Sequence, residues 1–137
     1  MDSRIDDLLR RAAAAHRIAV ERELAPLELK LAQFAVLQIV ADAPGVSSAE
    51  VARIERLTPP TMSVIVGNLE RKGALTRRAH ANNARIQCLE PTGIGLELMR
   101  NGRELVQAQK ERILTALPAE VAVAIDLWLR RVAAIEI

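Results

Sequence analysis

The pair Pro59-Pro60 is the feature that most constrains how the middle of this chain folds. Two consecutive prolines fit a helix only in its first turn, because proline lacks a backbone N–H and its ring clashes with a preceding helical turn. Thr58, directly before them, is a good N-cap residue. A helix therefore begins here, and any earlier helix must end by Leu57. We predict two short helices joined by a tight turn within residues 47–73.

The residues around this turn support both helices. Ser47 and Glu50 have the S-x-x-E spacing of a capping box, which starts the first helix, and Gly73 stands where the second helix needs a left-handed residue. The second helix carries one apolar stripe made by Met62, Ile65, Val66 and Leu69. The pattern is typical of a helix-turn-helix that reads a DNA major groove, and equally of a helical hairpin that only buries its stripe.

A basic β-hairpin is predicted directly after the second helix. Residues 75–79 and 86–89 have strand-like apolar spacing around a polar tip at residues 81–84. Its basic side chains are Arg77, Arg78, His80 and Arg85. A basic hairpin that follows a recognition helix is the layout of a winged helix.

The charge is concentrated in the same region. Residues 53–85 hold seven arginine and lysine residues against two glutamates, a local charge of +5, whereas the whole chain carries only +2. A basic patch on a near-neutral body favours a polyanionic partner such as DNA. The alternative is that these charges only solvate an exposed face.

Several segments of residues 29–98 resemble the multiple-antibiotic-resistance regulator (MarR) family. They read L-x-x-x-Q-F-x-V-L-x-I-V from Leu29, P-G-V-S-S-A-E-V-A from Pro44, T-M-S-V-I-V-x-N-L-E-R-K-G-A-L-x-R-R from Thr61, then N-A-R and P-T-G. The resemblance implies one protomer over residues 1–137, with a winged helix-turn-helix in residues 29–98. It implies that the terminal helices, in residues 1–24 and 99–137, form a twofold homodimer.

The resemblance also implies a transcriptional regulator, a repressor released by a small aromatic or phenolic effector. Its partner would be double-stranded DNA with a pseudo-palindromic operator. In the recognition helix, the expected DNA-binding residues are Thr58, Thr61, Ser63, Val64, Asn68 and Arg71; in the wing they are Arg77, Arg78, His80, Asn83 and Arg85. Candidates for lining an effector crevice are His16, Arg17 and Gln33, for which a solvated surface is the alternative interpretation.

The chain departs from the family pattern at the wing. The usual Asp-x-Arg of the wing tip reads Asn83-Ala84-Arg85, so the ion pair that orients the arginine is missing. Glu90 replaces the usual threonine cap, and the second strand is expected to be about two residues short.

The other segments are predicted to be helices, which gives a mainly α fold with a small β-wing. A helix of about 20 residues comes first, Pro26 starts the next, Pro91 opens a long helix to about Leu117, and Pro118 opens the last. Glycines 93, 95 and 102 should kink or fray the long helix. The last helix has an apolar face made by Val121, Ile125, Trp128, Val132 and Ile135 and is apolar on other sides too, so we expect a second subunit to cover it.

Composition argues against several functions. The chain has one Cys, two His and no Gly-rich phosphate loop, so no enzyme, metal site or cofactor is predicted. Its acidic first residues are not followed by an uninterrupted apolar segment, so no signal peptide is expected. Its longest apolar run is too short to span a bilayer, so a cytoplasmic protein that does not bind a membrane is expected. The alternative function is a winged-helix dimer, a decoy or antirepressor, that binds another protein through Met62 and Val64 without specific DNA binding.

Overall fold

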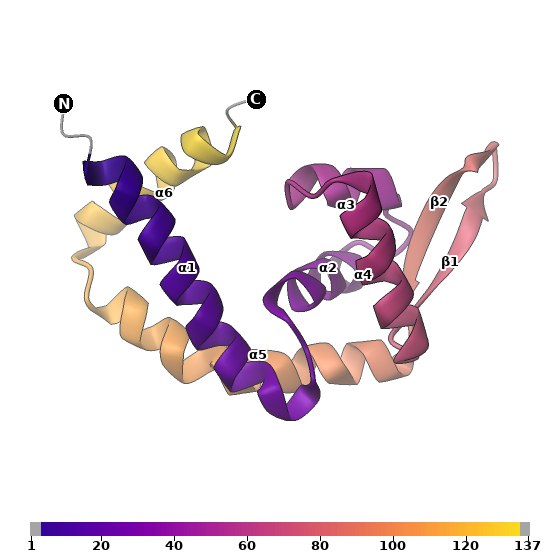
Figure 1. Ribbon diagram of the computed structural model, residues 1–137, viewed down its shortest axis with the longest axis horizontal. Helices are drawn as coiled ribbons and strands as arrows, with labels where there is room; N and C mark the ends of the chain where they lie inside the picture. Colours follow the sequence, from indigo (N-terminus) through magenta and orange to yellow (C-terminus); the bar gives the residue numbers. More distant parts are fainter. Residues whose placement is uncertain (1–3, 135–137) are drawn as a thin grey trace. The chain divides into compact units, whose positions relative to one another are not determined.

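The computed structural model describes residues 4–134 and consists mainly of α-helices with one β-hairpin, as predicted (Figure 1). The elements are α1 (Arg4–Leu24), the 3₁₀ turn η1 (Ala25–Leu27), α2 (Leu31–Asp42), α3 (Ser48–Ile54), α4 (Pro59–Arg71), β1 (Leu75–His80), β2 (Asn83–Pro91), α5 (Gly93–Thr115) and α6 (Ala119–Ala134). The chain forms two compact units, one that ends at Val106 and one that begins at Gln107. The break falls within α5.

The first unit contains the hydrophobic core. The predicted stripe of α4 is fully buried, and α2 contributes its own buried side chains from the neighbouring helix. The base of the hairpin closes this core with Leu75 and Leu89. Burial of these aliphatic side chains away from water is the main force that holds α4 and the hairpin against α2.

The two short helices begin where their caps predict. Ser47 Oγ accepts a hydrogen bond from the Glu50 N–H at 3.1 Å, and Thr58 Oγ1 accepts one from the Thr61 N–H at 3.4 Å. The reciprocal half of the capping box differs, because the Glu50 carboxylate pairs with Arg53. Gly73 has the expected left-handed backbone, with a φ of 73°.

The start of α2 was predicted wrongly. Pro26 lies in the η1 turn, and α2 begins only at Leu31. Glu28 has a left-handed backbone, with a φ of 54°, which ends the turn and separates it from α2. Gln33 then caps α2, because its Oε1 accepts a hydrogen bond from the Lys30 N–H at 3.1 Å.

The start of α5 also differs from the prediction. Pro91 is the last residue of β2, and α5 begins two residues later at Gly93. Thr92 caps it: Oγ1 accepts a hydrogen bond from the Gly95 N–H at 3.0 Å and donates one to the Gly73 carbonyl at 2.5 Å. The threonine cap is therefore present, displaced from Glu90 to Thr92, and it ties α5 to the end of α4.

The glycines of α5 do not interrupt it, because the helix is continuous from Gly93 to Thr115. At Gly95 an added Cβ would stand 1.9 Å from the Ala74 carbonyl oxygen, and at Gly102 it would stand 2.4 Å from Phe34 Cε2. These two glycines permit close approach of α5 to its neighbours, and the helix is not broken at either of them.

The second unit differs from the first in having no buried apolar side chain among its described residues. Along α6, Val123 and Leu127 are 62% and 60% exposed, and Trp128 and Leu129 are each 42% exposed. Ile135, predicted to extend this apolar face, lies outside the described residues.

Within residues 4–134, no single helix is both long and apolar enough to cross a membrane. Only the bent pair formed by residues 4–27 and 31–42, at 74° to each other, meets the length and composition of a span.

Candidate nucleic-acid interface

The outward face of α4 carries the predicted reading residues. Thr61, Val64, Asn68 and Arg71 occur at i, i+3, i+7 and i+10 and form one stripe opposite the buried face, since 3.6 residues make a turn. Val64 is 61% exposed. At the helix N-terminus the Thr58 hydroxyl donates a hydrogen bond to the Thr61 hydroxyl at 3.0 Å. The outward face of α4 thus presents short polar side chains together with the two exposed methyl groups of Val64.

Asn68 does not stand alone on this stripe. The Arg71 guanidinium, one turn later, donates a hydrogen bond to Asn68 Oδ1. An amide oxygen has two acceptor sites, so this bond orients the Asn68 amide and leaves it able to accept a second donor. By contrast, Met62 is only 2% exposed, and it cannot be the surface contact that the protein-binding alternative assigned to it.

The hairpin begins on a packed base and extends outward. Its strands pair antiparallel, with Leu75 opposite Pro91 and Arg78 opposite Cys88, and a register shift occurs between Ala79 and His80. Cys88 is buried and forms an isolated bridge with Ser47. The second strand has nine residues, longer than the apolar run that predicted it.

Arg77 and Arg78 point to opposite faces of the hairpin, because successive residues of a strand alternate. Arg77 donates hydrogen bonds to Glu70 Oε1 at 2.5 Å and to Gln87 Oε1 at 3.2 Å. Arg78 pairs with Glu90 at 3.0 Å. Sequence reasoning missed these partners. The pairs join residues 7, 10 and 12 positions apart, and they follow from the strand register and from the packing of the hairpin beside α4.

The wing tip is shaped by side chains that bond to its backbone. His80 Nδ1 accepts a hydrogen bond from the Asn82 N–H, and Asn83 Oδ1 accepts one from the Arg85 N–H, each at 3.1 Å. Asn83 therefore stabilises the backbone of Arg85. Within the described residues no ion pair is recorded for the exposed Arg85 guanidinium.

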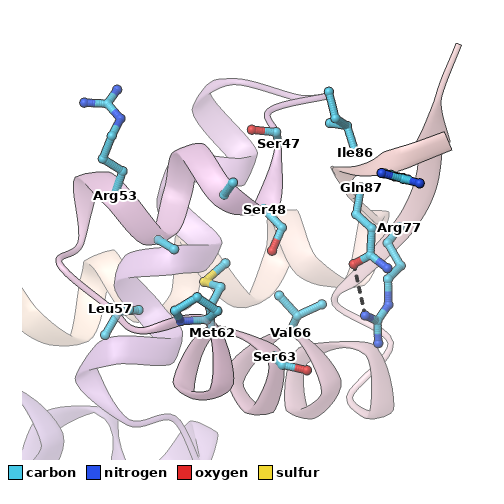
Figure 2. Close-up of a pocket in the computed structure, with 14 residues that line it drawn as sticks. Ser47, Ser48, Arg53, Leu57, Met62, Ser63, Val66, Arg77, Ile86 and Gln87 are labelled. Carbon is cyan, nitrogen blue, oxygen red and sulfur yellow. Dashed lines mark hydrogen bonds between the residues drawn. The ribbon is translucent and has the colours of Figure 1, made fainter. Parts of the chain in front are cut away.

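A cleft of about 650 Å³ opens between α3, α4 and the wing (Figure 2). Ser63 and Val66 of α4 line one side, and Arg85 and Gln87 of β2 line the other. Figure 2 shows Arg77 and Gln87 joined at the wing side of this cleft. Ser63 from the predicted helix set and Arg77 and Arg85 from the predicted wing set thus line one opening.

One titratable group near this region is perturbed. Burial raises the pKa of the Glu55 carboxyl, which lies at the C-cap of α3. A negative charge at a helix C-terminus also opposes the helix dipole.

The three candidates for an effector crevice have ordinary local roles. Gln33 caps α2, Arg17 pairs with Glu21 at 3.8 Å, and His16 is exposed on α1. Among residues 4–134, no cluster of three or more His, Cys, Asp or Glu side chains could hold a metal ion.

A capped two-helix unit with an exposed polar stripe, followed by a basic antiparallel hairpin, defines a winged helix-turn-helix. Residues 27–86 match the model of the MarR family. The HTH-type transcriptional repressor Rv2887 of Mycobacterium tuberculosis is 35% identical over 118 residues, which cover 86% of this chain and 85% of that protein. The chain belongs to the MarR family. It is a winged-helix DNA-binding transcriptional regulator and not an enzyme.

Solved structures agree with this assignment. Rv2887 in complex with p-aminosalicylic acid has a TM-score of 0.70 and 31% identity, covering 94% of this chain and 98% of that one. CouR from Rhodococcus jostii RHA1, bound to p-coumaroyl-CoA, has a TM-score of 0.87 and 26% identity over 98% and 95% of the two chains. A mutant MarR of E. coli, complexed with operator DNA, has a TM-score of 0.85 and 20% identity over 95% and 94%, which shows a shared fold.

Proposed function

We propose that the chain is a repressor that binds operator DNA as a homodimer, with α4 in the major groove and the β1–β2 wing along the adjacent minor groove. The observation that carries the proposal is the exposed stripe of α4 beside a basic hairpin whose tip presents the Arg85 guanidinium. Repression is supported by the names of the mycobacterial relatives. Such a protein acts in the cytoplasm, where bacterial DNA lies.

Different residues of α4 make different contacts with the DNA in this proposal. Asn68 can bond an adenine edge with both its amide groups, and Arg71 holds that amide in place. The methyl groups of Val64 suit the methyl of a thymine. Thr61 and Ser63 lie nearer the N-terminus, where short hydroxyls can reach bases. Thr58 caps that end, where its hydroxyl can reach a phosphate.

The wing supplies charge and shape recognition. An arginine in a narrow A·T-rich minor groove is attracted by its concentrated negative potential, and this is the proposed role of Arg85. His80 and Asn83 fix the backbone of the tip that carries it. Arg78, on the hairpin face that Glu90 shares, is assigned to phosphate.

The dimer is proposed from the exposed apolar surface of the terminal helices. Large apolar side chains are exposed on α1 (Ile5, Leu8 and Ile18), at the end of α5 (Ile113 and Leu114) and along α6 (Val121, Val123, Leu127, Trp128 and Leu129). An exposed apolar surface of this extent marks an interface. A twofold dimer would place two winged helices on a pseudo-palindromic operator whose half-sites lie roughly one helical turn apart.

Sedimentation equilibrium of the whole chain tests the dimer. We expect twice the mass of 15.0 kDa at micromolar concentration. Deletion of Pro118 to Ile137 should give aggregated or unfolded protein, because the proposed dimer interface is lost and the remaining apolar side chains stay exposed to water. A folded, soluble monomer from that deletion would contradict the proposal.

A small aromatic anion is proposed as the effector. The support is that Rv2887 was crystallised with p-aminosalicylic acid and CouR with p-coumaroyl-CoA. His16, Arg17 and Gln33 remain the proposed lining. Titration with p-aminosalicylate is expected to release fluorescently labelled operator DNA from the protein. The Arg17→Ala variant is expected to release less of this DNA.

Selection from a random double-stranded DNA pool at two salt concentrations tests DNA reading itself. We expect one enriched pseudo-palindrome, bound more weakly at the higher salt concentration because phosphate contacts release counterions. A folded dimer that enriches no sequence would favour the alternative, a decoy or antirepressor that docks on another protein through exposed apolar groups such as Val64.

A further inference from the structure

The wing is packed only at its base. Leu75 and Leu89 are buried there, and backbone hydrogen bonds of 2.8 Å join Leu89 to Gly45 and to Val46. Beyond this base the side chains of both strands are largely exposed, and the open cleft separates them from α3 and α4 (Figure 2). Apolar packing therefore fixes the root of the wing and leaves the angle of its outer part to polar contacts. An isolated two-stranded hairpin is only marginally stable in water.

A polar contact links the outer wing to the recognition helix. Arg77 of β1 bonds Glu70, in the last turn of α4, and also Gln87 of β2. The side chains of Arg77 and Glu70 are 34% and 31% exposed, so both are shielded from much of the solvent. A planar guanidinium can hold two acceptors in fixed directions, which a lysine cannot do.

The strand register explains why this arginine reaches both partners. Arg77 lies opposite Leu89, so Gln87 is its diagonal neighbour on the same face of the hairpin. This face of the hairpin is directed towards α4, and Glu70 lies in the last turn of that helix. Arg78 and Glu90 form the equivalent diagonal pair on the other face, and both belong to the hairpin. Of the two arginines, Arg77 also bonds a residue of α4, Glu70, in the described part of the chain.

We propose that Arg77 is a positioning residue, which sets the angle of the wing against the recognition helix through Glu70 and Gln87, and is not a phosphate contact. The inference rests on the proposed DNA-binding function. A fixed angle lets α4 and Arg85 reach adjacent grooves of one duplex without an ordering cost on binding. Glu70 then favours DNA binding although its charge repels DNA.

The sign of the effect of Glu70→Gln tests this role. Electrostatics alone predicts tighter binding, because one negative charge beside the DNA is removed. Positioning predicts binding to the selected operator about threefold to fivefold weaker, the size expected for a half-shielded ion pair. Glu90→Gln is the matched control: it removes the same charge from a pair inside the hairpin, so it should leave the operator affinity unchanged or slightly tighter.

The salt dependence of binding distinguishes a positioning arginine from a phosphate contact. Arg77→Gln should weaken binding while the slope of log K against log salt stays that of the parent, whereas loss of a phosphate contact lowers the slope by about 0.9. The double variant Glu70→Arg/Arg77→Glu exchanges the two charges. It should bind the operator at least about fivefold better than the single variant Arg77→Glu, because the ion pair is re-formed. Thermal unfolding of each variant confirms that it is folded.

Tighter binding by Glu70→Gln, a reduced salt slope for Arg77→Gln, or no rescue by the exchange would each overturn the positioning role, while the proposed function stands as long as the parent chain binds its operator. A parent chain that selects no operator overturns the proposed function and this inference with it.

Discussion

Gly102 of α5 lies so close to the ring of Phe34 in α2 that an added Cβ would be 2.4 Å from Phe34 Cε2 and 3.0 Å from Cδ2. The ring is 3% exposed and belongs to the core of the first unit. A glycine that would normally weaken a helix is therefore what allows α5 to pack on α2. Arg103, the next residue, donates hydrogen bonds to Gln38 and to Asp42 of α2 at 3.0 and 3.3 Å.

Gly102→Ala should destabilise the protein by about 1–3 kcal/mol, because the methyl group forces the buried ring or α5 to move. Helix propensity alone predicts the opposite sign, a gain of up to about 1 kcal/mol. Gly93→Ala is the control, since nothing lies within 4 Å of its Cβ. Urea unfolding of the three proteins measures the difference, and a stabilised Gly102→Ala would refute the close contact.

Asn68→Ala should relax base choice at one position in each half-site, at a cost of about 1–3 kcal/mol for the preferred base. The reason is that the amide held by Arg71 is the side chain on the α4 stripe able to bond an adenine bidentately. Comparison of the sequences selected by the parent and by the variant measures this. Ser63→Ala should alter a different position, and an unchanged sequence preference in Asn68→Ala would mean that Asn68 reads no base.

Arg85→Ala should weaken binding to A·T-flanked operators more than to G·C-flanked ones, and lower the salt slope by at most about one. Because Asn83 engages the backbone of Arg85 and the guanidinium has no recorded ion pair in the described chain, the side chain loses entropy on binding, up to about 2 kcal/mol.

Asn83→Asp is the companion variant. An aspartate can accept the same N–H and also attract the guanidinium, so we expect tighter binding despite the added negative charge. Equal binding of Arg85→Ala to both kinds of flank would show that the wing tip does not enter the minor groove.

Glu55→Gln should stabilise the protein at neutral pH. Burial raises the pKa of this carboxyl in the folded state, so the contribution of Glu55 to folding is favourable below its unfolded pKa and is lost as the pH rises through the raised value. The stability gained by Glu55→Gln should therefore grow as the pH rises above the ordinary pKa of a glutamate carboxyl. Glu97→Gln, on an exposed part of α5, controls for the loss of one charge. A gain that does not grow with pH would contradict the assignment.

The local chemistry of the chain predicted much of the fold. The caps at Ser47 and Thr58, the paired prolines and the stripe of α4 all lie as expected, because each depends on residues within one or two helical turns. The hairpin was predicted because its two strands and its polar tip are also close together in the sequence. Pro26 misled the prediction, since proline fits the first turn of a 3₁₀ helix as well as that of an α-helix.

Tertiary relations could not be predicted in this way. The partners of Arg77 depend on strand register, and the reason for Gly95 and Gly102 lies in α2 and in the backbone of Ala74. Helix propensity alone predicts that both glycines weaken α5. Packing explains them instead, because each glycine allows a neighbouring group to approach α5 closely. The candidate DNA-binding residues could be selected because they share exposed faces of single elements, and their roles on DNA stay predictions.

Binding of the whole chain to its selected operator, intact and with one half-site scrambled, tests the central claim most directly. A dimeric reader should bind the intact duplex with two chains, and scrambling several base pairs of one half-site should cost at least about a hundredfold in affinity, since each mismatch costs about 1–3 kcal/mol. One chain per duplex, or equal affinity for the intact and scrambled operators, would contradict the account.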